Sequence, residues 1–257
     1  MLNTIRKANQ TFPPQKIVCY GVQGIGKTSF GATFDSPVLL PVEDGAAAID
    51  VDAFPLMTSF EQVTDAITAL HEDHQFKTLV LDSLDWLEPL VWDMTCRANG
   101  KDSIEAFGYG KGYAEADKYW RYLMSGFDSL RLNKGMTILL LAHSEVKKVE
   151  PPETDPFDRY QMRLHKRAFA LWQEWSDMNL FLNYRVSVQK SAEGFGQERV
   201  RGVGTGDRVI YTTERPAYDA KSRWPLPEEI FVGKDKTWNA FHKALNEATG
   251  GRYSKGE

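Results

Sequence analysis

The feature that most constrains this chain is an eight-residue segment, GVQGIGKT, that follows a short apolar run. The segment from Gly21 to Thr28 has the spacing G-x-x-x-x-G-K-[ST], in which backbone amides surround phosphate oxygens, the lysine reaches the terminal phosphates and the hydroxyl binds magnesium. Glycine is needed where the backbone closes on the phosphates, and a following helix directs its amino-terminal amides at the same anion. An ordinary glycine turn is the alternative, but the strand before the octet and the helix after it favour a Walker A loop.

The Walker A loop predicts which residues hold a nucleotide and its metal ion. We expect ATP and Mg²⁺ as the cofactors, with the hydroxyl of Thr28 as a metal ligand. Lys27 is also expected to take part in catalysis, because its charge lies at the terminal phosphates. The predicted nucleotide-binding residues are Gly21, Val22, Gln23, Gly24, Ile25, Gly26, Lys27, Thr28 and Ser29.

The composition is typical of one large cytoplasmic domain. With 257 residues, 42% of them hydrophobic, the chain can bury a full core. No apolar run approaches the roughly 18 residues of a membrane span, and the start of the chain lacks the apolar centre of a signal peptide. Two cysteines, Cys19 and Cys96, are expected to be buried, reduced and not catalytic. Because the net charge is -4, any binding to nucleic acid must come from local clusters, and we expect no membrane partner.

Apolar runs alternate with segments of helical periodicity along the chain. Strands are predicted at 16–20, 37–43, 77–83, 136–143, 178–188, 208–214 and 227–233. Helices are predicted from about residue 27 and at 60–73, 84–98, 114–133 and 236–248. Three prolines predict an irregular segment at 144–160. The alternation predicts an α/β fold with a mainly parallel twisted sheet, helices on both faces and a C-terminal β extension.

The run TLVLDS has the form of a Walker B strand. Its last apolar residue is followed by Asp82, and an aspartate at this place holds the magnesium shell through water. Many strands end in Asp-Ser as a helix cap, so Asp82 or Ser83 could instead cap the helix that begins at Leu84. The position after a Walker A loop favours the metal role, and we predict Thr28 and Asp82 as the metal-binding pair.

The order of these motifs resembles that of the RecA-like core ATPases, and most closely the phage-encoded Sak-type single-strand annealing ATPases. The resemblance covers most of residues 16–233 and rests on the segments GVQGIGKT, LVLDS, ILLLAH and DAKSRWPLP. It implies an N-terminal arm (1–15), a RecA-like P-loop ATPase core (16–233), and a C-terminal helix and tail (234–257). It also implies a DNA-stimulated ATPase that binds single-stranded DNA and promotes annealing and recombination of phage DNA.

The resemblance also implies catalytic residues. In that family a glutamate at the end of the strand after the P-loop helix polarises the attacking water, and Glu43 is at this place. A carboxylate there lies at the edge of the sheet where ligands bind. Asp44 is the substitute, and capping of a turn is the alternative role for both. The family places a polar γ-phosphate sensor after the strand between the two Walker strands, which is His143 here, although relatives often carry glutamine or asparagine. A surface histidine is the alternative.

The segment DAKSRWPLP resembles the K-x-R element of RecA-like and DnaB-like assemblies. Lys221 and Arg223 are two positions apart in an extended segment, so both can address one anion. The resemblance implies that they reach the ATP of a neighbouring subunit, as an arginine finger does, so that hydrolysis takes place at subunit interfaces. A surface pair stacked on Trp224 is the alternative. The N-terminal arm, with Ile5 and Phe12, can hook onto a neighbour or be disordered.

RecA-type proteins bind single-stranded DNA through two mobile loops, which the resemblance places at 99–112 and 144–167. Cations and aromatic residues alternate in both, as sequence-independent binding to a single strand requires. In the second segment six cations accompany five anions, so a solvated loop with surface ion pairs is the alternative. The predicted DNA-binding residues are Lys101, Phe107, Tyr109, Lys111, Lys147, Lys148, Arg159 and Arg163.

The expected partners are single-stranded DNA, further copies of the chain in a ring or filament, and a single-strand-binding protein. Three other functions fit the same motifs: a ring helicase or packaging motor, a small-molecule kinase, and a scaffold that binds ATP without hydrolysing it. A helicase is disfavoured by the expectation that only about fifteen residues precede the first strand. A kinase would need an arginine-bearing lid over a phosphate acceptor.

Overall fold

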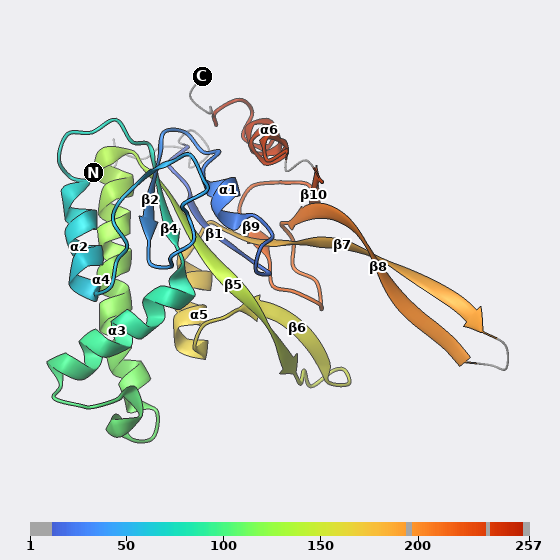
Figure 1. The fold of residues 1–257 in the computed structure, drawn as a ribbon, viewed down its shortest axis with the longest axis horizontal. Coiled ribbons are helices and arrows are strands. Elements are labelled where there is room, and N and C mark those ends of the chain that lie inside the picture. Colours follow the sequence, from blue (N-terminus) through green and yellow to red (C-terminus); the bar gives the residue numbers. More distant parts are fainter. Residues whose placement is uncertain (1–11, 194–196, 235–236, 254–257) are drawn as a thin grey trace, which may run out of the picture.

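The structure is a computed structural model, and it describes residues 12–193, 197–234 and 237–253. The strands within these residues are β1 (Lys16–Gly21), β2 (Pro37–Pro41), β3 (Asp52–Ala53), β4 (Thr78–Asp82), β5 (Thr137–Val149), β6 (Phe157–Met162), β7 (Met178–Glu193), β8 (Gln197–Tyr211), β9 (Lys221–Ser222) and β10 (Glu229–Gly233). They form one sheet in the order β10-β8-β7-β1-β5-β4-β2-β3, with β6 on β5 and β9 on β7 (Figure 1).

The sheet is parallel in its centre and antiparallel at one side. The strands β7, β1, β5, β4, β2 and β3 run parallel to their neighbours in this series. The pairs β7–β8, β8–β10, β5–β6 and β7–β9 are antiparallel. The predicted α/β class, with its mainly parallel sheet and its C-terminal β extension, is confirmed.

Both faces of the central sheet are covered by helices. The helices are α1 (Lys27–Gly31), α2 (Phe60–Ala69), α3 (Leu84–Ala98), the 3₁₀ helix η3 (Ile104–Phe107), α4 (Lys111–Lys134), α5 (Lys166–Trp175) and α6 (Asn239–Ala248). Val18 and Tyr20 of β1 belong to the core beneath α2, α3, α4 and α5, whereas Ile17 and Cys19 belong to the core beneath α1 and α6. Unbroken apolar runs are the expected pattern for strands that are buried on both faces.

Most of the segment 144–160 is regular, contrary to the prediction. Strand β5 continues past His143 to Val149 and pairs antiparallel with β6. The three prolines lie in the connection at 150–156, where the backbone forms no ladder that a missing N–H would interrupt. We call residues 144–162 the β5–β6 hairpin. The predicted residues Lys147, Lys148 and Arg159 therefore lie on this hairpin and not on an irregular loop.

Two further features were not predicted. Helix α5 overlaps only the last two residues of the segment that was expected to be a mobile loop, and beyond that segment it buries Ala168 and Trp172 against the body. Strands β7 and β8 are longer than predicted and form a hairpin that projects from the body (Figure 1). Residues 194–196, between these two strands, lie outside the described part of the chain.

The two ends of the described chain pack on the body. The ring of Phe12 lies 4.9 Å from that of Trp224, so this residue of the N-terminal arm contacts its own chain. Ile5 lies outside the described residues. The ring centre of Phe241 in α6 lies 5.2 Å from that of Phe30 in α1. Helix α6 thus fixes the helix that follows the Walker A loop. No helix formed by the described residues is both long and apolar enough to span a bilayer.

Candidate nucleotide-binding site

The Walker A loop connects β1 to α1 at the carboxyl edge of the sheet. Gly24 and Gly26 have φ angles of 73° and 106°, in the region that residues with a side chain rarely adopt. A Cβ atom on Gly21 would lie 2.2 Å from the carbonyl oxygen of Leu182 on β7. The three glycines of the motif are therefore required by the backbone conformation at two positions and by a close approach at the third.

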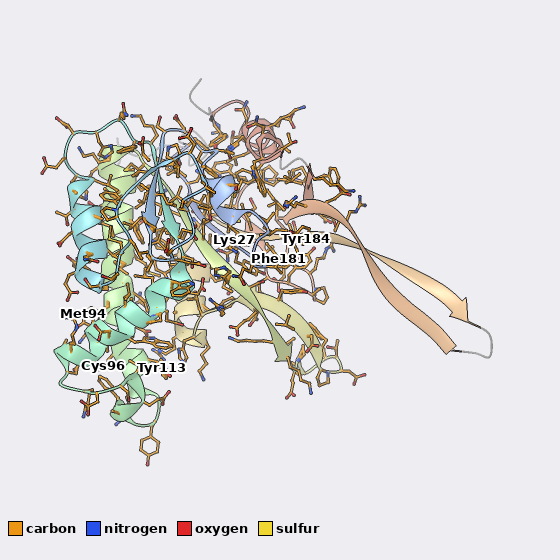
Figure 2. All side chains as sticks on the ribbon, in the orientation of Figure 1. Lys27, Met94, Cys96, Tyr113, Phe181 and Tyr184 are labelled. Carbon is orange, nitrogen blue, oxygen red and sulfur yellow. The ribbon has the colours of Figure 1, made fainter. Side chains whose placement is uncertain are left out.

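Lys27 is held inside the loop. Its side chain is almost completely buried, and Nζ donates hydrogen bonds to the carbonyl oxygens of Gly21 and Val22, both at 3.2 Å. Burial lowers the pKa of the ammonium group, and nearby anionic groups, Asp82 among them, oppose this shift. Figure 2 labels Lys27 in the middle of the molecule, far from Cys96 and Tyr113 at the α3–α4 end.

Thr28 and Asp82 form the predicted metal-binding pair. The Oγ1 hydroxyl of Thr28 donates a hydrogen bond of 2.6 Å to Oδ2 of Asp82, the last residue of β4. Burial raises the pKa of Asp82, while the Thr28 hydrogen bond and the charge of Lys27 lower it. A hydroxyl and a carboxylate are the hard oxygen ligands that Mg²⁺ prefers, so this pair fits the ion. When bound, Mg²⁺ neutralises charge on the β and γ phosphates.

The helix-cap alternative does not describe these residues. Ser83 occupies the N-cap position of α3, but its side chain makes no capping hydrogen bond. Its Oγ hydroxyl instead donates to Oε2 of Glu43 at 3.5 Å. The carboxylate of Asp82 is engaged by Thr28. Asp82 therefore faces the Walker A loop, and Ser83 faces Glu43.

Glu43 follows β2 at the same edge of the sheet. Its Oε2 atom lies 3.8 Å from Nδ1 of His143, and its backbone amide donates to the carbonyl of Asp82 at 3.1 Å. Burial raises the pKa of the Glu43 carboxyl, and the neighbouring imidazole lowers it. Asp44, the predicted substitute, is exposed. Of the two carboxylates, Glu43 is the one that the structure places beside the loop.

One cavity brings together six of the nine predicted nucleotide-binding residues, whereas Gly21, Val22 and Ile25 do not line it. It has a volume of about 250 Å³ and is lined by Gln23, Gly24, Gly26, Lys27, Thr28, Ser29, Glu43, Gly45, Ile49, Asp82 and His143. A larger cavity of about 480 Å³ lies near the end of α1, but its charged lining residues are Asp50 and Asp52, which repel phosphate. The smaller cavity has the lysine, the hydroxyl and the carboxylates that nucleotide chemistry needs.

His143 occupies the predicted position between the Walker strands. Strand β5 pairs with both β1 and β4, and His143 is in register with Gly21. The residue is only 9% exposed, so the surface-histidine alternative is wrong. Its backbone N–H and its Nδ1 atom lie 2.9 and 3.0 Å from the two carboxylate oxygens of Asp85. Asp85 was not predicted as a site residue, because an acidic residue in the first turn of a helix also fits the helix dipole.

Arg208 of β8 is a second residue that the sequence did not reveal. Its Nε atom donates to the carbonyl oxygen of Ile25 in the Walker A loop at 2.8 Å. A second guanidinium nitrogen donates to the carbonyl of Lys234 at 3.1 Å, and the group lies 5.3 Å from the ring centre of Tyr184 (labelled in Figure 2). The base of the projecting hairpin is thereby bonded to the loop. Because Arg208 and Ile25 are 183 positions apart in the sequence, their contact leaves no local pattern in it.

The predicted pair Lys221 and Arg223 lies apart from the cavity. Strand β9 pairs with the first residues of β7, and Met178 is in register with Ile17 near the start of β1. The Walker A loop follows the last residue of β1, at the opposite end of the strand from Ile17. Lys221 donates to the carbonyl of Gln173, and the exposed guanidinium of Arg223 lies 3.1 Å from Asp177.

The stacking alternative for Arg223 is not what the structure shows. Among the described residues, the cation placed over the Trp224 ring is Arg252, at 5.9 Å from the ring centre.

The predicted DNA-binding residues divide into two groups. Phe107, near Lys101, closes η3, and Lys111 begins α4. Tyr109 between them is fully exposed. On β5, Lys148 is exposed, whereas Lys147 is partly buried and also donates to the carbonyl oxygen of Leu164 at 3.3 Å. Both lysines pair with neighbouring glutamates.

Arg159 and Arg163 have partners inside the chain. Arg159 is mostly buried and pairs with Asp219 at 2.8 Å as well as with Glu214. The Nε atom of Arg163 lies 3.1 Å from Asp85, and a second nitrogen contacts the same oxygen. These two arginines are structural contacts of the hairpin base, which disfavours the predicted contact with DNA.

The fold and the cavity together define a P-loop nucleotide-binding domain. The family model of the AAA domain matches residues 13–224, which is most of the chain. The chain belongs to this AAA domain family and is an AAA-type P-loop ATPase domain. A search of curated proteins found no match.

Proposed function

We propose that this AAA-type domain is a DNA-stimulated ATPase that binds single-stranded DNA, promotes annealing and recombination of phage DNA, and hydrolyses ATP between subunits. The observation that carries the proposal is the continuity of β5, which contains both His143 at the cavity and Lys147 and Lys148 on the hairpin. At about 3.3 Å per residue, the strand separates His143 from Lys147 by about 13 Å. The annealing role rests on the resemblance of the sequence motifs to the Sak-type proteins.

The exposed lysines of β5 suit a phosphate backbone. Lys147 pairs with Glu145 at 2.8 Å and Lys148 with Glu150 at 3.8 Å, and about half of each lysine side chain is exposed. Exposed ion pairs of this kind contribute about 0–1 kcal/mol, so the phosphates of a strand can replace the glutamates. Release of counterions from the strand then favours binding at low salt.

Tyr109 supplies an exposed aromatic ring. It has a φ angle of 50° and lies between Gly108 and Gly110, which also have positive φ angles. This turn holds the side chain away from the body, where a base can stack on it. In Figure 1 the connection between α3 and α4 and the β5–β6 hairpin extend to the same end of the molecule, away from α6.

The test is ATP turnover with and without single-stranded DNA, at low and at moderate salt. We expect stimulation by single strands that weakens as salt rises, and little stimulation by duplex DNA of equal length. Glu43→Gln serves as the control for background turnover. Turnover that DNA does not change would contradict the DNA role, a requirement for a phosphate acceptor would favour a kinase, and binding without turnover would favour a scaffold.

A further inference from the structure

The carboxylate of Asp85 is the most heavily bonded buried charge beside the cavity. Its side chain is 1% exposed and lies in the first turn of α3. One oxygen accepts the backbone N–H of His143 at 2.9 Å, and the other lies 3.0 Å from Nδ1 of the same residue. Arg163 donates two further hydrogen bonds to this second oxygen. A buried carboxylate is costly unless it is paired and hydrogen-bonded in this way.

The charge on Asp85 determines which nitrogen of His143 carries a proton. Although burial raises the pKa of the Asp85 carboxyl, hydrogen bonds from His143 and Arg163 more than offset this and hold the pKa below its ordinary value. An ionised carboxylate only accepts hydrogen bonds, so the imidazole must be protonated at Nδ1. The partner of one ring nitrogen fixes the tautomer and the orientation of the ring.

We propose that Asp85 is a positioning residue for ATP hydrolysis, which holds His143 protonated at Nδ1 and fixes its ring at the wall of the cavity beside Glu43. The inference rests on the proposed function and on the predicted role of His143 as the sensor of the terminal phosphate. Arg163 supplies the compensating charge, and its backbone N–H donates to the carbonyl of His143 at 2.8 Å. Arg163, the residue that follows the β5–β6 hairpin, therefore balances the negative charge of Asp85 beside the imidazole.

Glu88 provides a matched control on the same helix. It lies three residues after Asp85 and is equally buried. Its two oxygens both accept the backbone N–H of His165 at 3.1 Å. Among the described residues, no hydrogen bond or ion pair joins Glu88 to the imidazole of His143, so Glu88→Gln replaces a buried carboxyl group of α3 and leaves the sensor intact.

The test combines nitrogen-15 NMR of the imidazoles with steady-state kinetics of the whole chain. His143→Asn identifies the His143 signals among the five histidines. In the native chain we expect Nδ1 of His143 to be protonated. Asp85→Asn should mix the two tautomers and lower kcat by about 10- to 100-fold, the usual range for a residue that orients a histidine of the site, while KM for ATP changes less than about 2-fold. Glu88→Gln should leave the His143 signals and kcat unchanged.

The outcomes separate the inference from the proposed function. A native His143 with an unprotonated Nδ1 would overturn the inference without any variant, which covers the case in which Asp85→Asn does not fold. Native kcat in folded Asp85→Asn, or an equal loss in Glu88→Gln, would also overturn it. The role of Asp85 is measured by ATP turnover without DNA. An absence of stimulation by DNA would therefore contradict the proposed function and leave the inference standing.

Discussion

The hydroxyl of Thr28 lies 2.6 Å from the carboxylate of Asp82, although the two residues are 54 positions apart in the sequence. One follows the P-loop lysine and the other ends β4, so the contact joins the two Walker motifs across the strand β5. A magnesium ion that is shared by both residues needs this separation to be short. The pair thus shows how parallel strands bring distant motifs to one edge of a sheet.

Lys27→Ala should abolish tight binding of ATP, because the β and γ phosphates lose their main cation. The measurement is equilibrium binding of a fluorescent ATP analogue in the presence of magnesium. Lys16→Ala is the control, since Lys16 lies at the other end of β1 and pairs with Asp128 at 3.6 Å. An affinity of Lys27→Ala within about 3-fold of the native value would contradict the site.

Glu43→Gln should bind ATP but hydrolyse it about 10²- to 10⁴-fold more slowly, because the amide cannot accept a proton from water. Asp44→Asn is the matched control, because Asp44 is the next residue along the chain and is exposed. Release of phosphate in a single turnover measures the chemical step. A native rate in Glu43→Gln together with a loss in Asp44→Asn would exchange the two assignments.

Glu88→Gln should stabilise the fold at alkaline pH. Burial raises the pKa of Glu88 to about 7 from an ordinary value of 4.5. Between these values the folded chain keeps a proton that the unfolded chain has lost, so the free energy of unfolding decreases as pH rises through this window. The glutamine cannot ionise and keeps an acceptor for His165. At pH 8 it should raise the free energy of unfolding by on the order of 1–3 kcal/mol.

Urea denaturation at pH 8 and at pH 4.5 measures the effect of Glu88→Gln. The difference from the native chain should be small at pH 4.5, where the glutamate is protonated in the folded state. Glu115→Gln on α4 is the control for an exposed glutamate, which pairs with Lys118 at 3.4 Å. Equal stability of Glu88→Gln and the native chain at pH 8 would refute the prediction.

Replacing both Lys147 and Lys148 by alanine should weaken binding to single-stranded DNA and flatten its salt dependence, because about two phosphate contacts are lost. Tyr109→Ala should cost about 1–3 kcal/mol of binding free energy through lost stacking. Fluorescence anisotropy over a salt series separates the two effects. Lys243→Ala and Tyr122→Ala are the controls, on exposed residues of α6 and α4. Unaltered binding in all variants would show that neither segment contacts DNA.

If ATP is hydrolysed between subunits as proposed, Arg223→Ala should retain ATP binding but lose hydrolysis, because the neighbouring subunit's ATP would lose its arginine. Mixing Arg223→Ala with Lys27→Ala should restore partial turnover, since some interfaces then pair an intact loop with an intact arginine. Arg215→Ala is the control, an exposed arginine that pairs with Glu228. The assay is ATP turnover with single-stranded DNA under conditions that allow subunit exchange. Full activity of Arg223→Ala by itself would exclude the interfacial role.

The sequence was sufficient to predict the central strands and the Walker residues, because each of these corresponds to a pattern of neighbouring residues. The octet from Gly21 to Thr28 and the apolar run before Asp82 are such patterns. The position of His143 between the Walker strands followed from the family resemblance, and the pairing of β5 with β1 and β4 agrees with it.

The remaining features depend on tertiary contacts or on misleading local signals. Asp85 meets His143 over 58 residues, and its place in a helix start offers a sufficient local reason for an acid. The prolines of the β5–β6 hairpin predicted an irregular segment, although they occupy only its connection. The cations near Lys166 concealed the helical spacing of Ala168 and Trp172 in α5.

Arg223 and the Walker A loop lie at opposite ends of the same strands, as the register of β9 on β7 and of β7 on β1 shows. Two copies related by a two-fold rotation bring identical surfaces together. An arginine that completes the neighbour's site needs unlike surfaces to meet, so the copies must follow one another in a single direction. If Arg223 serves the neighbouring subunit as proposed, the cavity at one end of an open row of copies lacks its arginine and the arginine at the other end lacks a cavity. Only a closed ring completes every site. In an open row the fraction of incomplete sites is largest when the row is short, so a short row has the lowest activity per subunit.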